Sequence, residues 1–352
     1  MSGSEEKRVI IVGGGIAGLA VARLLSQNNL EFSIIEKSDR LGGHVKEWAC
    51  MATDECKNCE CCMVYDYEDA VASSSKSEIL TEHELLEVIN SGHGIQGVKV
   101  RNRMSGAEKI INGSAMVIAC GFETFDPVDK GFWGYGRIDG VITLADLNRA
   151  LRFNHIEKSF PNKESELHFA FFQCIGSRDK SIGADYCSQY CCGAAIRAAL
   201  KLVHKLPKAK ITVFYIDLQL AGKTAPTLVD EALQKGIRFV QGVPGEILPL
   251  KEGGLQIITE IDGRNIVERF DQIALSVGQR PPASATMISS LTKVPLNEFG
   301  FFQTQSDLDT ARSAVPGVYL AGCCSGPGSI SDVSISAGQV ASAIIADMKK
   351  AN

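Results

Sequence analysis

The sequence has no uninterrupted run of eighteen apolar residues, no basic tract and no histidine motif. The missing apolar run excludes a membrane-spanning helix within its 352 residues. The net charge is −5 without clustered Lys or Arg, which gives no reason to expect nucleic acid as a partner. The six histidines form neither an H-x₃-H pair nor a His-Asp-Ser pattern. The polar start MSGSEEKR lacks the apolar segment of a signal peptide, so we expect a cytoplasmic protein that makes no membrane contact.

Cysteine, by contrast, is abundant, with 12 in the chain. Cytosolic thiols stay reduced, so clusters of them indicate metal or redox chemistry before structural disulfides. Two stretches hold most of them: CKNCECC, which begins at Cys56, and CIGSRDKSIGADYCSQYCC, which runs from Cys174 to Cys192. Isolated cysteines such as Cys50 and Cys120 are predicted to be small buried side chains.

A dinucleotide-binding motif opens the chain. The segment RVIIVGGGIAGLAVARLLSQ predicts a strand, a glycine turn and an amphipathic helix, with Gly13, Gly15 and Gly18 in the G-x-G-x-x-G spacing. We expect Gly13 to allow the tight turn, Gly15 to let the backbone approach a pyrophosphate, and Gly18 to let helix and strand pack closely. A second predicted strand ends at Glu36, where a carboxylate accepts hydrogen bonds from a ribose diol.

The residues that follow Glu36 extend this motif. An acid followed by Arg40 and the Gly42-Gly43 pair resembles the adenine-dinucleotide signature of flavoproteins with two dinucleotide-binding domains, and this resemblance favours FAD over NAD. Such proteins carry an Ala-Thr-Gly crossing near Gly121, where this chain has cysteine in place of threonine. The predicted FAD contacts are Gly13, Gly15, Ile16, Ala17, Gly18, Glu36, Lys37, Arg40, Gly43, His44, Gly121, Gly322, Cys323 and Cys324.

A second α/β unit begins near Leu167, with a strand, a helix and another strand, and no other internal repeat is visible. We therefore expect an α/β fold with two Rossmann-like dinucleotide-binding domains, as in a thioredoxin-reductase-like two-domain flavoprotein. The predicted FAD domain is discontinuous, residues 1–145 plus 280–352. The predicted second domain is residues 146–279, and its first turn carries cysteines where a nicotinamide site has glycines.

The cysteines of this second turn have the spacing C-x₁₂-C-x₃-C-C. Cys174 ends a predicted strand, and the last three cysteines are expected to open the following helix, with Cys187 and Cys191 one turn apart on the same face. Four thiolates converging there suit a [4Fe–4S] cluster, whose negative charge Arg178 and Lys180 could offset. A zinc site prefers two separated C-x₂-C pairs. Zinc, or four buried cysteines without a ligand, nevertheless remains an alternative at this point.

These motifs resemble a known family. CIGSRD followed by YCSQYCC, together with GFETFDP and GCCSGP, resembles the flavin-carrying A subunit of heterodisulfide reductase, HdrA. The resemblance implies an oxidoreductase subunit with FAD and a [4Fe–4S] cluster whose ligands are Cys174, Cys187, Cys191 and Cys192. Because methanogen HdrA is longer and carries additional ferredoxin-like parts, the chain is more similar to the short HdrA-like form of sulfur oxidisers. That form implies HdrB-like and HdrC-like partner subunits, a homodimer or paired HdrA-like chain, and cytoplasmic sulfur oxidation.

The remaining cysteines and Arg197 lie outside the glycine turn and the C-x₁₂-C-x₃-C-C motif. Cys56, Cys59, Cys61 and Cys62 lie too close in sequence to wrap one cubane easily, and we expect no cluster there. Cys323 stands where related flavoproteins have an aspartate, so we expect flavin contacts from the backbone N–H groups of Cys323 and Cys324. A helix beginning near Ser331 would point its dipole at the flavin. No side chain is expected to act as a catalytic acid, base or nucleophile; Arg197, one turn beyond Cys192, is a possible flavin-tuning residue or a solvated surface arginine.

Two other functions stay open from the sequence. The first is an NAD(P)H-dependent FAD disulfide reductase of the thioredoxin-reductase type, for which Asp217 would be the nicotinamide-ribose acid. Its glycine-rich turn is missing, which disfavours this alternative. The second is a non-enzymatic scaffold that holds FAD for structure alone.

Overall fold

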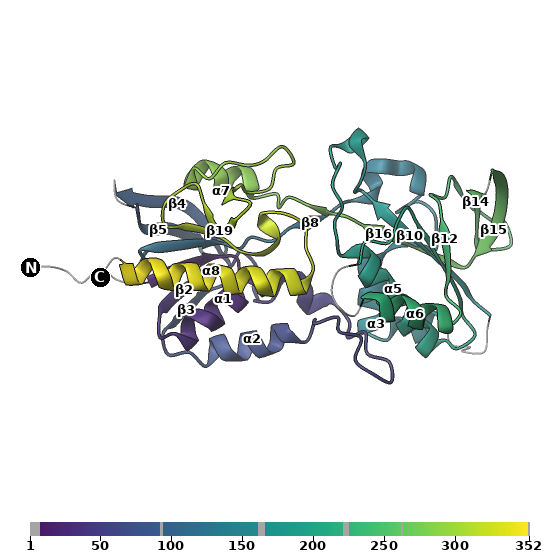
Figure 1. The fold of residues 1–352 in the computed structure, drawn as a ribbon, viewed down its shortest axis with the longest axis horizontal. Coiled ribbons are helices and arrows are strands. Elements are labelled where there is room, and N and C mark those ends of the chain that lie inside the picture. The colour runs from purple at the N-terminus through teal and green to yellow at the C-terminus, as the bar shows by residue number, and fades with distance from the viewer. Residues whose placement is uncertain (1–7, 92–93, 161–165, 221–224, 262, 351–352) are drawn as a thin grey trace, which may run out of the picture. The chain divides into compact units, whose positions relative to one another are not determined.

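The structure is a computed structural model that describes residues 8–91, 94–160, 166–220, 225–261 and 263–350 (Figure 1). The chain forms two compact units, each with a Rossmann-like sheet. The first comprises Met1–Lys46, Glu60–Glu123 and Pro281–Asn352, and the second comprises Glu47–Cys59 and Thr124–Arg280. The short strands β8 (Glu123–Thr124) and β17 (Gln279–Arg280) pair where the chain passes between the units.

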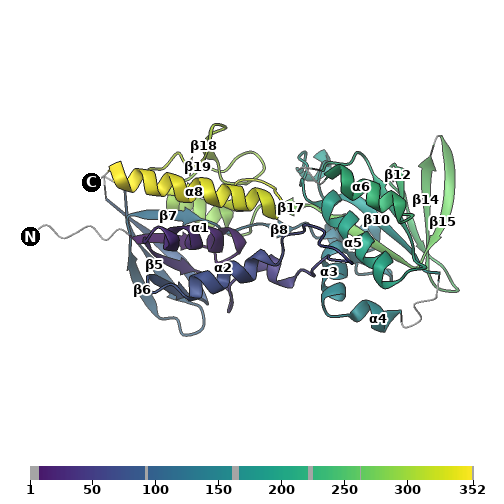
Figure 2. The same cartoon turned by 60° about the horizontal axis from the view of Figure 1, so that its bottom comes forward.

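The first unit is built on a sheet of order β18-β19-β20-β7-β1-β2-β3, in which the strands from β20 to β3 are parallel. Its core is formed by alternating residues of these strands and by the antiparallel sheet β4-β5-β6. Helices α1 and α8 lie side by side over the sheet (Figures 1 and 2). The element bounds are β1 Arg8–Val12, α1 Ile16–Gln27, β2 Glu31–Ile35, η1 Gly43–Glu47, α2 Met63–Ala72, β3 Ser77–Leu80, β4 His83–Ser91, β5 Gly94–Asn102, β6 Glu108–Asn112, β7 Ala115–Ile118, α7 Ala285–Thr292, β18 Thr304–Ser306, β19 Asp309–Ser313, β20 Val318–Leu320, η4 Gly322–Cys324 and α8 Ile330–Lys350.

The second unit is built on a sheet of order β12-β11-β10-β16-β9, with all neighbours parallel. Helices α5 and α6 pack beside each other, and their apolar faces share a core with β10 and β11. An antiparallel sheet, β13-β14-β15, completes the unit. The bounds are η2 Pro127–Trp133, β9 Val141–Thr143, α3 Leu144–Arg152, α4 His155–Ser159, β10 His168–Ile175, η3 Lys180–Ile182, α5 Cys191–Lys205, β11 Lys210–Tyr215, α6 Ala225–Gln234, β12 Arg238–Gln241, β13 Ile247–Pro249, β14 Leu255–Ile261, β15 Arg264–Phe270 and β16 Gln272–Val277.

The division between the units differs from the expected one in two places. The first crossing lies at Glu123 rather than at residue 145, because β9 pairs with β16 in the second sheet and therefore places residues 124–145 in the second unit. Residues 47–59 also belong to the second unit. The backbone N–H of Ala49 donates to Asn148 Oδ1 at 3.0 Å, and Met51 is buried in the core beneath α3 and α5.

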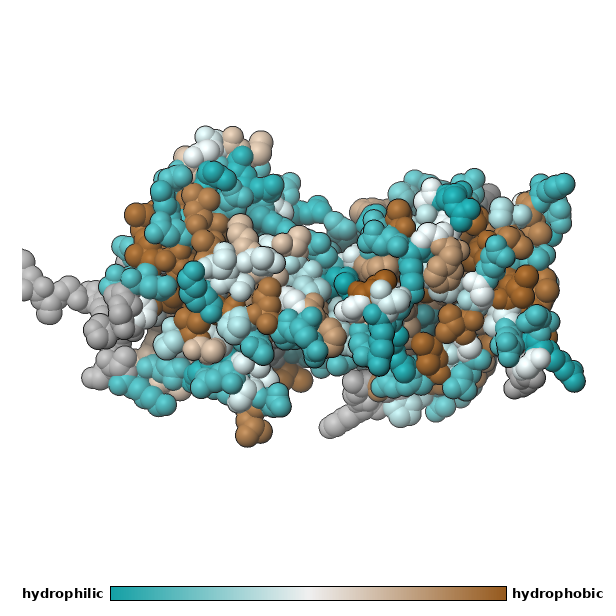
Figure 3. All heavy atoms as spheres, turned by 90° about the horizontal axis from the view of Figure 1, so that it is seen from above, coloured by the Kyte–Doolittle hydropathy of each residue, from teal (hydrophilic) through white to brown (hydrophobic). Residues whose placement is uncertain are grey.

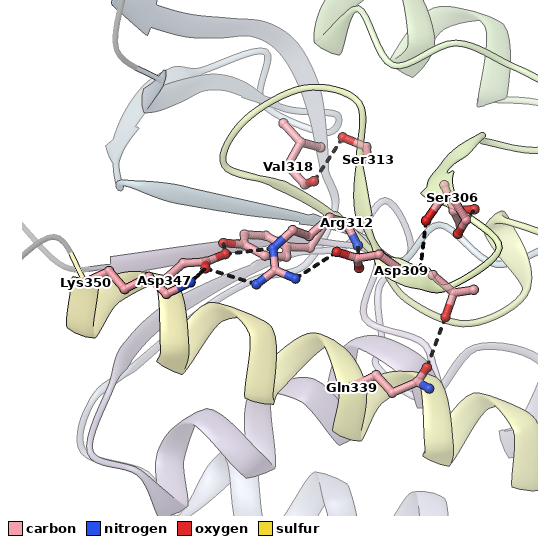
Figure 4. Close-up of polar contacts among 11 residues, drawn as sticks. Ser306, Asp309, Arg312, Ser313, Val318, Gln339, Asp347 and Lys350 are labelled. Carbon is pink, nitrogen blue, oxygen red and sulfur yellow. Dashed lines mark hydrogen bonds and ion pairs between the residues drawn. The ribbon is translucent and has the colours of Figure 1, made fainter.

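A polar network holds α8 against the sheet of the first unit (Figure 4). Arg312 on β19 donates from Nε and Nη2 to the two carboxylate oxygens of Asp347, at 2.9 and 3.0 Å. Its Nη1 donates to Asp309 at 2.9 Å, and the Tyr319 hydroxyl donates to Asp347 at 2.9 Å. A bidentate guanidinium–carboxylate pair of this kind fixes both the distance and the orientation of the helix.

Apolar residues on the surface gather in several small groups between polar ones on the face drawn in Figure 3. Leu308 and Ile335 are among the exposed large side chains. Scattered exposed apolar residues of this kind are common on folded proteins. Among the described residues, no helix has both the length and the apolar character needed to cross a bilayer.

Candidate cofactor sites

The glycine turn of the first unit joins β1 to α1, and its three motif glycines have different surroundings. A Cβ on Gly13, whose φ is +111°, would lie 2.3 Å from the carbonyl oxygen of Ala119. A Cβ on Gly18 would lie 2.0 Å from the carbonyl oxygen of Gly13. A Cβ on Gly15 would meet no atom within 4 Å. Gly13 and Gly18 are therefore required by packing, while Gly15 borders open space at the N-terminus of α1, where a phosphate can approach the backbone.

The second glycine pair supports this turn. The backbone N–H of Gly42 donates to the carbonyl of Gly14 at 2.8 Å. A Cβ on Gly43, whose φ is +55°, would lie 3.2 Å from the Cα of Gly15. The pair therefore lies directly against the dinucleotide turn, which gives a structural reason for its place in the extended motif.

Glu36 is buried at the end of β2, and its carboxylate binds the turn itself. Oε2 accepts from the backbone N–H of Gly14 at 2.7 Å, and Oε1 accepts from the backbone N–H and the hydroxyl of Ser38 at 2.8 and 2.7 Å. A carboxylate has about four acceptor positions, so about one remains for a ribose hydroxyl. Sequence reasoning assigned Glu36 only to the ribose and missed its second role in holding the glycine turn.

A cavity of about 210 Å³ opens beside this turn and collects residues from distant parts of the first unit. Of the predicted contacts, Gly13, Glu36 and Lys37 line it, and Cys120 lines it too. Arg103 Nη1 donates to the carbonyl of Lys37 at 2.8 Å. Sequence reasoning missed several lining residues because they come from β4, from the turn after β5 and from the start of α7, without a local motif: His83, Glu84, Leu85, Arg103, Ser284, Met287 and Ile288.

Three other predicted FAD contacts, Gly121, Arg40 and His44, do not line this cavity. Gly121 has a φ of +71°, and a Cβ there would meet nothing within 4 Å. Arg40 is exposed. His44 Nε2 lies 3.0 Å from the carbonyl of Phe122, and the two rings are 4.8 Å apart. The observed contacts of His44 therefore support the segment that follows β7.

The C-terminal GCC segment forms η4 after β20 and packs on the start of α1. A Cβ on Gly322, whose φ is +73°, would lie 2.7 Å from the Cβ of Ala17. The Cys324 thiol donates to the carbonyl of Ile118 at 3.1 Å, and the Cys323 thiol donates to the carbonyl of Gly328 at 3.6 Å. A hydrogen bond with Cys120 and burial raise the pKa of Cys324 well above its usual value. Both thiols therefore donate hydrogen bonds to backbone carbonyls of the first unit.

Helix α8 begins at Ile330, one residue before the expected start. Asp332, in its first turn, accepts from the backbone N–H and hydroxyl of Ser329 at 2.8 and 2.7 Å. This carboxylate offsets part of the positive end of the helix dipole that we expected to face a flavin.

In the second unit, Cys174 lies in a bulge at the end of β10. The register between β10 and β16 shifts between Phe172 and Ile175, and Cys174 has a φ of +63°. A positive φ is uncommon for a residue other than glycine, and bulges beside functional sites commonly redirect one side chain. The bulge thus gives Cys174 an orientation that a regular strand would not.

Cys187 lies in the loop before α5, so the expectation that three cysteines open the helix is wrong for Cys187. Helix α5 begins at Cys191, and Gln189 has a φ of +59°, which interrupts any earlier turn. The loop is anchored to the end of β16 instead. Tyr190 donates to the carbonyl of Val277 at 2.8 Å, and further contacts come from Tyr186, Ser188 and Gln279.

The four thiols of this turn interact electrostatically. Burial raises the pKa of Cys174 to about 11, and the nearby thiols Cys192 and Cys187 add to the shift. Burial also raises the pKa of Cys191 well above its usual value, with contributions from Cys192, Cys174 and Cys187. Without a metal, Cys174 and Cys191 are therefore protonated at neutral pH, and metal binding must release protons.

Donor groups and one positive charge face these sulfurs. The backbone N–H of Gln189 donates to Cys187 Sγ at 3.3 Å. Burial raises the pKa of Cys192, and the backbone N–H of Gln219 opposes that rise. The guanidinium of Arg178 likewise opposes the rise at Cys174. Lys180, the second cation expected from the sequence, instead extends toward solvent and lies 3.6 Å from Asp185.

The donor set can be tested against the two kinds of metal centre. Among the described residues, no three His, Cys, Asp or Glu side chains converge as a single metal ion requires. A four-iron cube separates its ligands further, because each sulfur binds a different iron, whereas zinc gathers all four around one ion. Near Cys174, the buried side-chain amide of Gln173 and hydroxyl of Ser177 have no hydrogen-bond partner among the described residues. The absence of such a convergent group among the described residues argues against a single zinc ion at these cysteines, and a [4Fe–4S] cluster at them stays a prediction.

Arg197 contacts the first part of the CKNCECC segment, which belongs to the second unit as far as Cys59. Arg197 Nε donates to the carbonyl of Lys57 at 2.7 Å. Lys57 Nζ in turn lies 2.7 Å from Glu231 Oε1, and only 8% of its side chain is exposed. Cys56 is exposed and Cys59 half-buried. The observed contact of Arg197 is therefore with this segment, and flavin tuning by Arg197 stays a prediction.

Comparison with known proteins gives a family and several relatives. Residues 7–344 match the family model for pyridine nucleotide-disulphide oxidoreductases. An HdrA-type iron-sulfur subunit of the CoB–CoM heterodisulfide reductase of Methanopyrus kandleri is 32% identical over 246 residues, which is 66% of this chain and 37% of that protein. The HdrA-type protein of the ferredoxin/F420H2-dependent enzyme of Methanosarcina acetivorans is 24% identical over 94% of this chain and 52% of that protein. The chain thus spans about a third to a half of these relatives.

Solved structures agree with the two-unit fold. Thioredoxin reductase of Lactococcus lactis has a TM-score of 0.62 at 18% identity, with 97% of this chain and 98% of that chain covered. Thioredoxin reductase of T. acidophilum has a TM-score of 0.61 at 15% identity, covering 97% and 99%. The expected thioredoxin-reductase-like fold is thereby confirmed.

Proposed function

The chain belongs to the pyridine nucleotide-disulphide oxidoreductase family, and from that premise we propose that it is an HdrA-like electron-transfer subunit. It binds FAD in the first unit and a [4Fe–4S] cluster at Cys174, Cys187, Cys191 and Cys192 in the second. The single observation that carries the proposal is the cysteine-bearing loop between β10 and α5, which stands in place of the second dinucleotide turn and in which Cys187 Sγ accepts from a backbone N–H.

FAD binding rests on the first glycine turn and its cavity. Gly15 leaves space for a pyrophosphate, and Glu36 keeps about one acceptor position for a ribose hydroxyl while it holds Gly14. Lys37 lines the cavity beside this turn, and Gly43 lies against Gly15. The names of the relatives support the cluster, since the Methanopyrus protein is called an iron-sulfur subunit.

The side chains and backbone of this chain bind and orient the two cofactors, and they transfer no protons in the reaction. FAD supplies one- or two-electron chemistry and the cluster single-electron chemistry. The bulge at Cys174 and the loop anchored by Tyr190 bring the thiols together from a strand end and a helix start. Backbone N–H groups and Arg178 favour the thiolate form of these ligands.

The proposed compartment, partner subunits and process come from the resemblance to HdrA. We propose that the protein works in the cytoplasm with HdrB-like and HdrC-like partners, which carry out the thiol or disulfide chemistry, as a homodimer or paired HdrA-like chain. Cytoplasmic sulfur oxidation is the proposed process. The relatives are named as parts of multisubunit heterodisulfide reductases, which supports a partner-dependent role.

The alternative, an NAD(P)H-dependent disulfide reductase, is favoured by the matched family model and by the thioredoxin-reductase fold. Between β10 and α5 the chain has the cysteine-bearing loop in place of a short glycine turn. Rapid bleaching of the flavin by NADH would support this alternative, whereas the proposed function predicts slow or absent bleaching.

Anaerobic purification followed by iron, sulfide and flavin analysis tests the proposal. We expect about four irons and four sulfides per chain, with one FAD. Serine at all four of Cys174, Cys187, Cys191 and Cys192 should remove the iron and leave the FAD. The matched control changes Cys56 and Cys59 to serine and should keep the iron. Iron-free wild-type protein, or iron retained in the four-serine variant, would refute the cluster.

A further inference from the structure

Asp217 occupies the position at which a second dinucleotide-binding unit would hold a ribose. It follows β11, the second strand of the β10–α5–β11 unit, and an acid at this place normally accepts hydrogen bonds from the ribose diol. Here Asp217 instead forms an ion pair with the guanidinium of Arg178. The acid that would recognise a nucleotide is thus turned toward the cysteine-bearing loop of its own chain.

Arg178 is held close to the thiols by its backbone. It lies four residues beyond Cys174, has a φ of +56°, and donates its backbone N–H to the carbonyl of Tyr186 at 2.9 Å. This bond closes the segment between Cys174 and Cys187 into a loop whose ends both lead to thiols. The Arg178 side chain contacts the Cys174 thiol and Asp217 together, so it connects a proposed ligand to a fixed negative charge.

Gln219 links the same acid to the other side of the thiol group. Its side-chain amide donates to Asp217, and its backbone N–H faces Cys192. The short segment from Asp217 to Gln219 therefore reaches both Cys174, through Arg178, and Cys192 directly. The segment is placed by β11, whose register with β10 is regular from Lys210 to Phe214.

We infer that Arg178 and Asp217 form a charge pair that sets the reduction potential of the cluster, and that Asp217 serves this pair instead of a nicotinamide ribose. This inference rests on the proposed function, because it requires a [4Fe–4S] cluster at the four cysteines. Arg178 and Asp217 are positioning and tuning residues, and neither is a ligand.

The direction of each effect follows from charge. Reduction adds one negative charge to the cluster, so a nearby guanidinium favours the reduced form and a nearby carboxylate disfavours it. Removing Arg178's charge should lower the reduction potential, and removing Asp217's charge should raise it. Their side chains are 31% and 43% exposed, so solvent reduces both effects. We expect roughly a tenfold change in the ratio of reduced to oxidised cluster at a fixed potential, which corresponds to about 59 mV.

The experiment is potentiometry of the cluster, followed by electron paramagnetic resonance, on anaerobically purified full-length protein. Arg178→Met and Asp217→Asn should shift the midpoint in opposite directions, down and up. Arg178→Lys keeps the charge and should stay near the wild-type value. Lys180→Met is the matched control, since Lys180 is a cation in the same loop that lies against Asp185 and toward solvent. It should leave the midpoint unchanged.

Opposite signs cannot arise from loosened structure alone, which makes the pair of variants decisive. If Arg178→Met loses iron, the upward shift in Asp217→Asn and the near-normal value in Arg178→Lys still decide the question. Unchanged or equally directed midpoints in Asp217→Asn and Arg178→Met would overturn the inference while leaving the cluster in place. Absence of iron from the wild-type protein would instead overturn the proposed function itself.

Discussion

The contrast between Gly15 and Gly18 gives a sharp test of the proposed FAD site. Both glycines belong to one motif, yet their surroundings predict different defects for the same added methyl group. An alanine at Gly15 has space and an ordinary φ of −71°, so the fold tolerates it, but its methyl occupies the approach of a pyrophosphate. An alanine at Gly18 collides with the carbonyl oxygen of Gly13 at 2.0 Å, so the turn itself must move.

The magnitudes follow from these distances. Gly15→Ala should cost at most about 1 kcal/mol of folding free energy at a helix N-cap. Crowding of the pyrophosphate by one methyl should cost about 1–3 kcal/mol of binding free energy, or roughly 5- to 150-fold in FAD affinity. Gly18→Ala meets rigid backbone, so about 3 kcal/mol or more of crowding exceeds the gain of about 1 kcal/mol in helix propensity. That variant should lose both stability and FAD.

The assay is fluorescence titration of FAD into flavin-depleted protein, with urea unfolding of the same samples. Gly338→Ala is the matched control, because this glycine lies within α8 and a Cβ there meets nothing within 4 Å. It should gain about 1 kcal/mol in stability and bind FAD normally. A Gly15→Ala protein that binds FAD as the wild type does would refute the placement of the pyrophosphate at this turn.

Two further predictions concern the Arg312–Asp347 ion pair and the contact between Arg197 and Lys57. Asp347→Ala should lower the free energy of unfolding by about 2–3 kcal/mol, because it removes the ion pair with Arg312 and leaves the buried Tyr319 hydroxyl without its acceptor. Asp347→Asn should lower the free energy of unfolding by about 1 kcal/mol. The hydrogen bonds from Arg312 lower the pKa of Asp347, so this stabilisation is present at neutral pH and is lost as pH falls below about 4, which urea unfolding across pH measures. Arg197→Ala should expose Lys57 to trypsin, and Arg197→Lys less so; equal protection of Lys57 in both would contradict the observed contact.

The sequence predicted the first dinucleotide turn well because every determinant is local. Gly13, Gly15 and Gly18 fall within one strand–turn–helix, and the acid at Glu36 follows in the next strand. The lining residues His83 and Met287 carry no such pattern, since only the folded sheet brings β4 and α7 to this cavity.

The assignment of residues 47–59 to the second unit was not predictable from periodicity. This segment has no regular strand or helix apart from the end of η1, and it is held by single contacts from distant residues, such as Asn148 and Arg197. The same reason explains the displaced crossing at Glu123. A strand as short as β9 is recognised only through its pairing with β16, and that partner lies more than a hundred residues further along the chain.

The loop between β10 and α5 shows why spacing alone misplaced Cys187. A separation of four positions between two cysteines predicts one helical face only if the helix already includes both, and here the positive φ of Gln189 delays the start of the helix to Cys191. A short glycine turn, as at residues 13–15, brings a helix N-terminus to the strand end, where its N–H groups bind a phosphate. The longer loop at residues 176–190 folds back on β16 instead and directs thiols and Arg178 toward that strand end. The longer loop therefore brings cysteines and Arg178 to a strand end that a short glycine turn would leave to a phosphate.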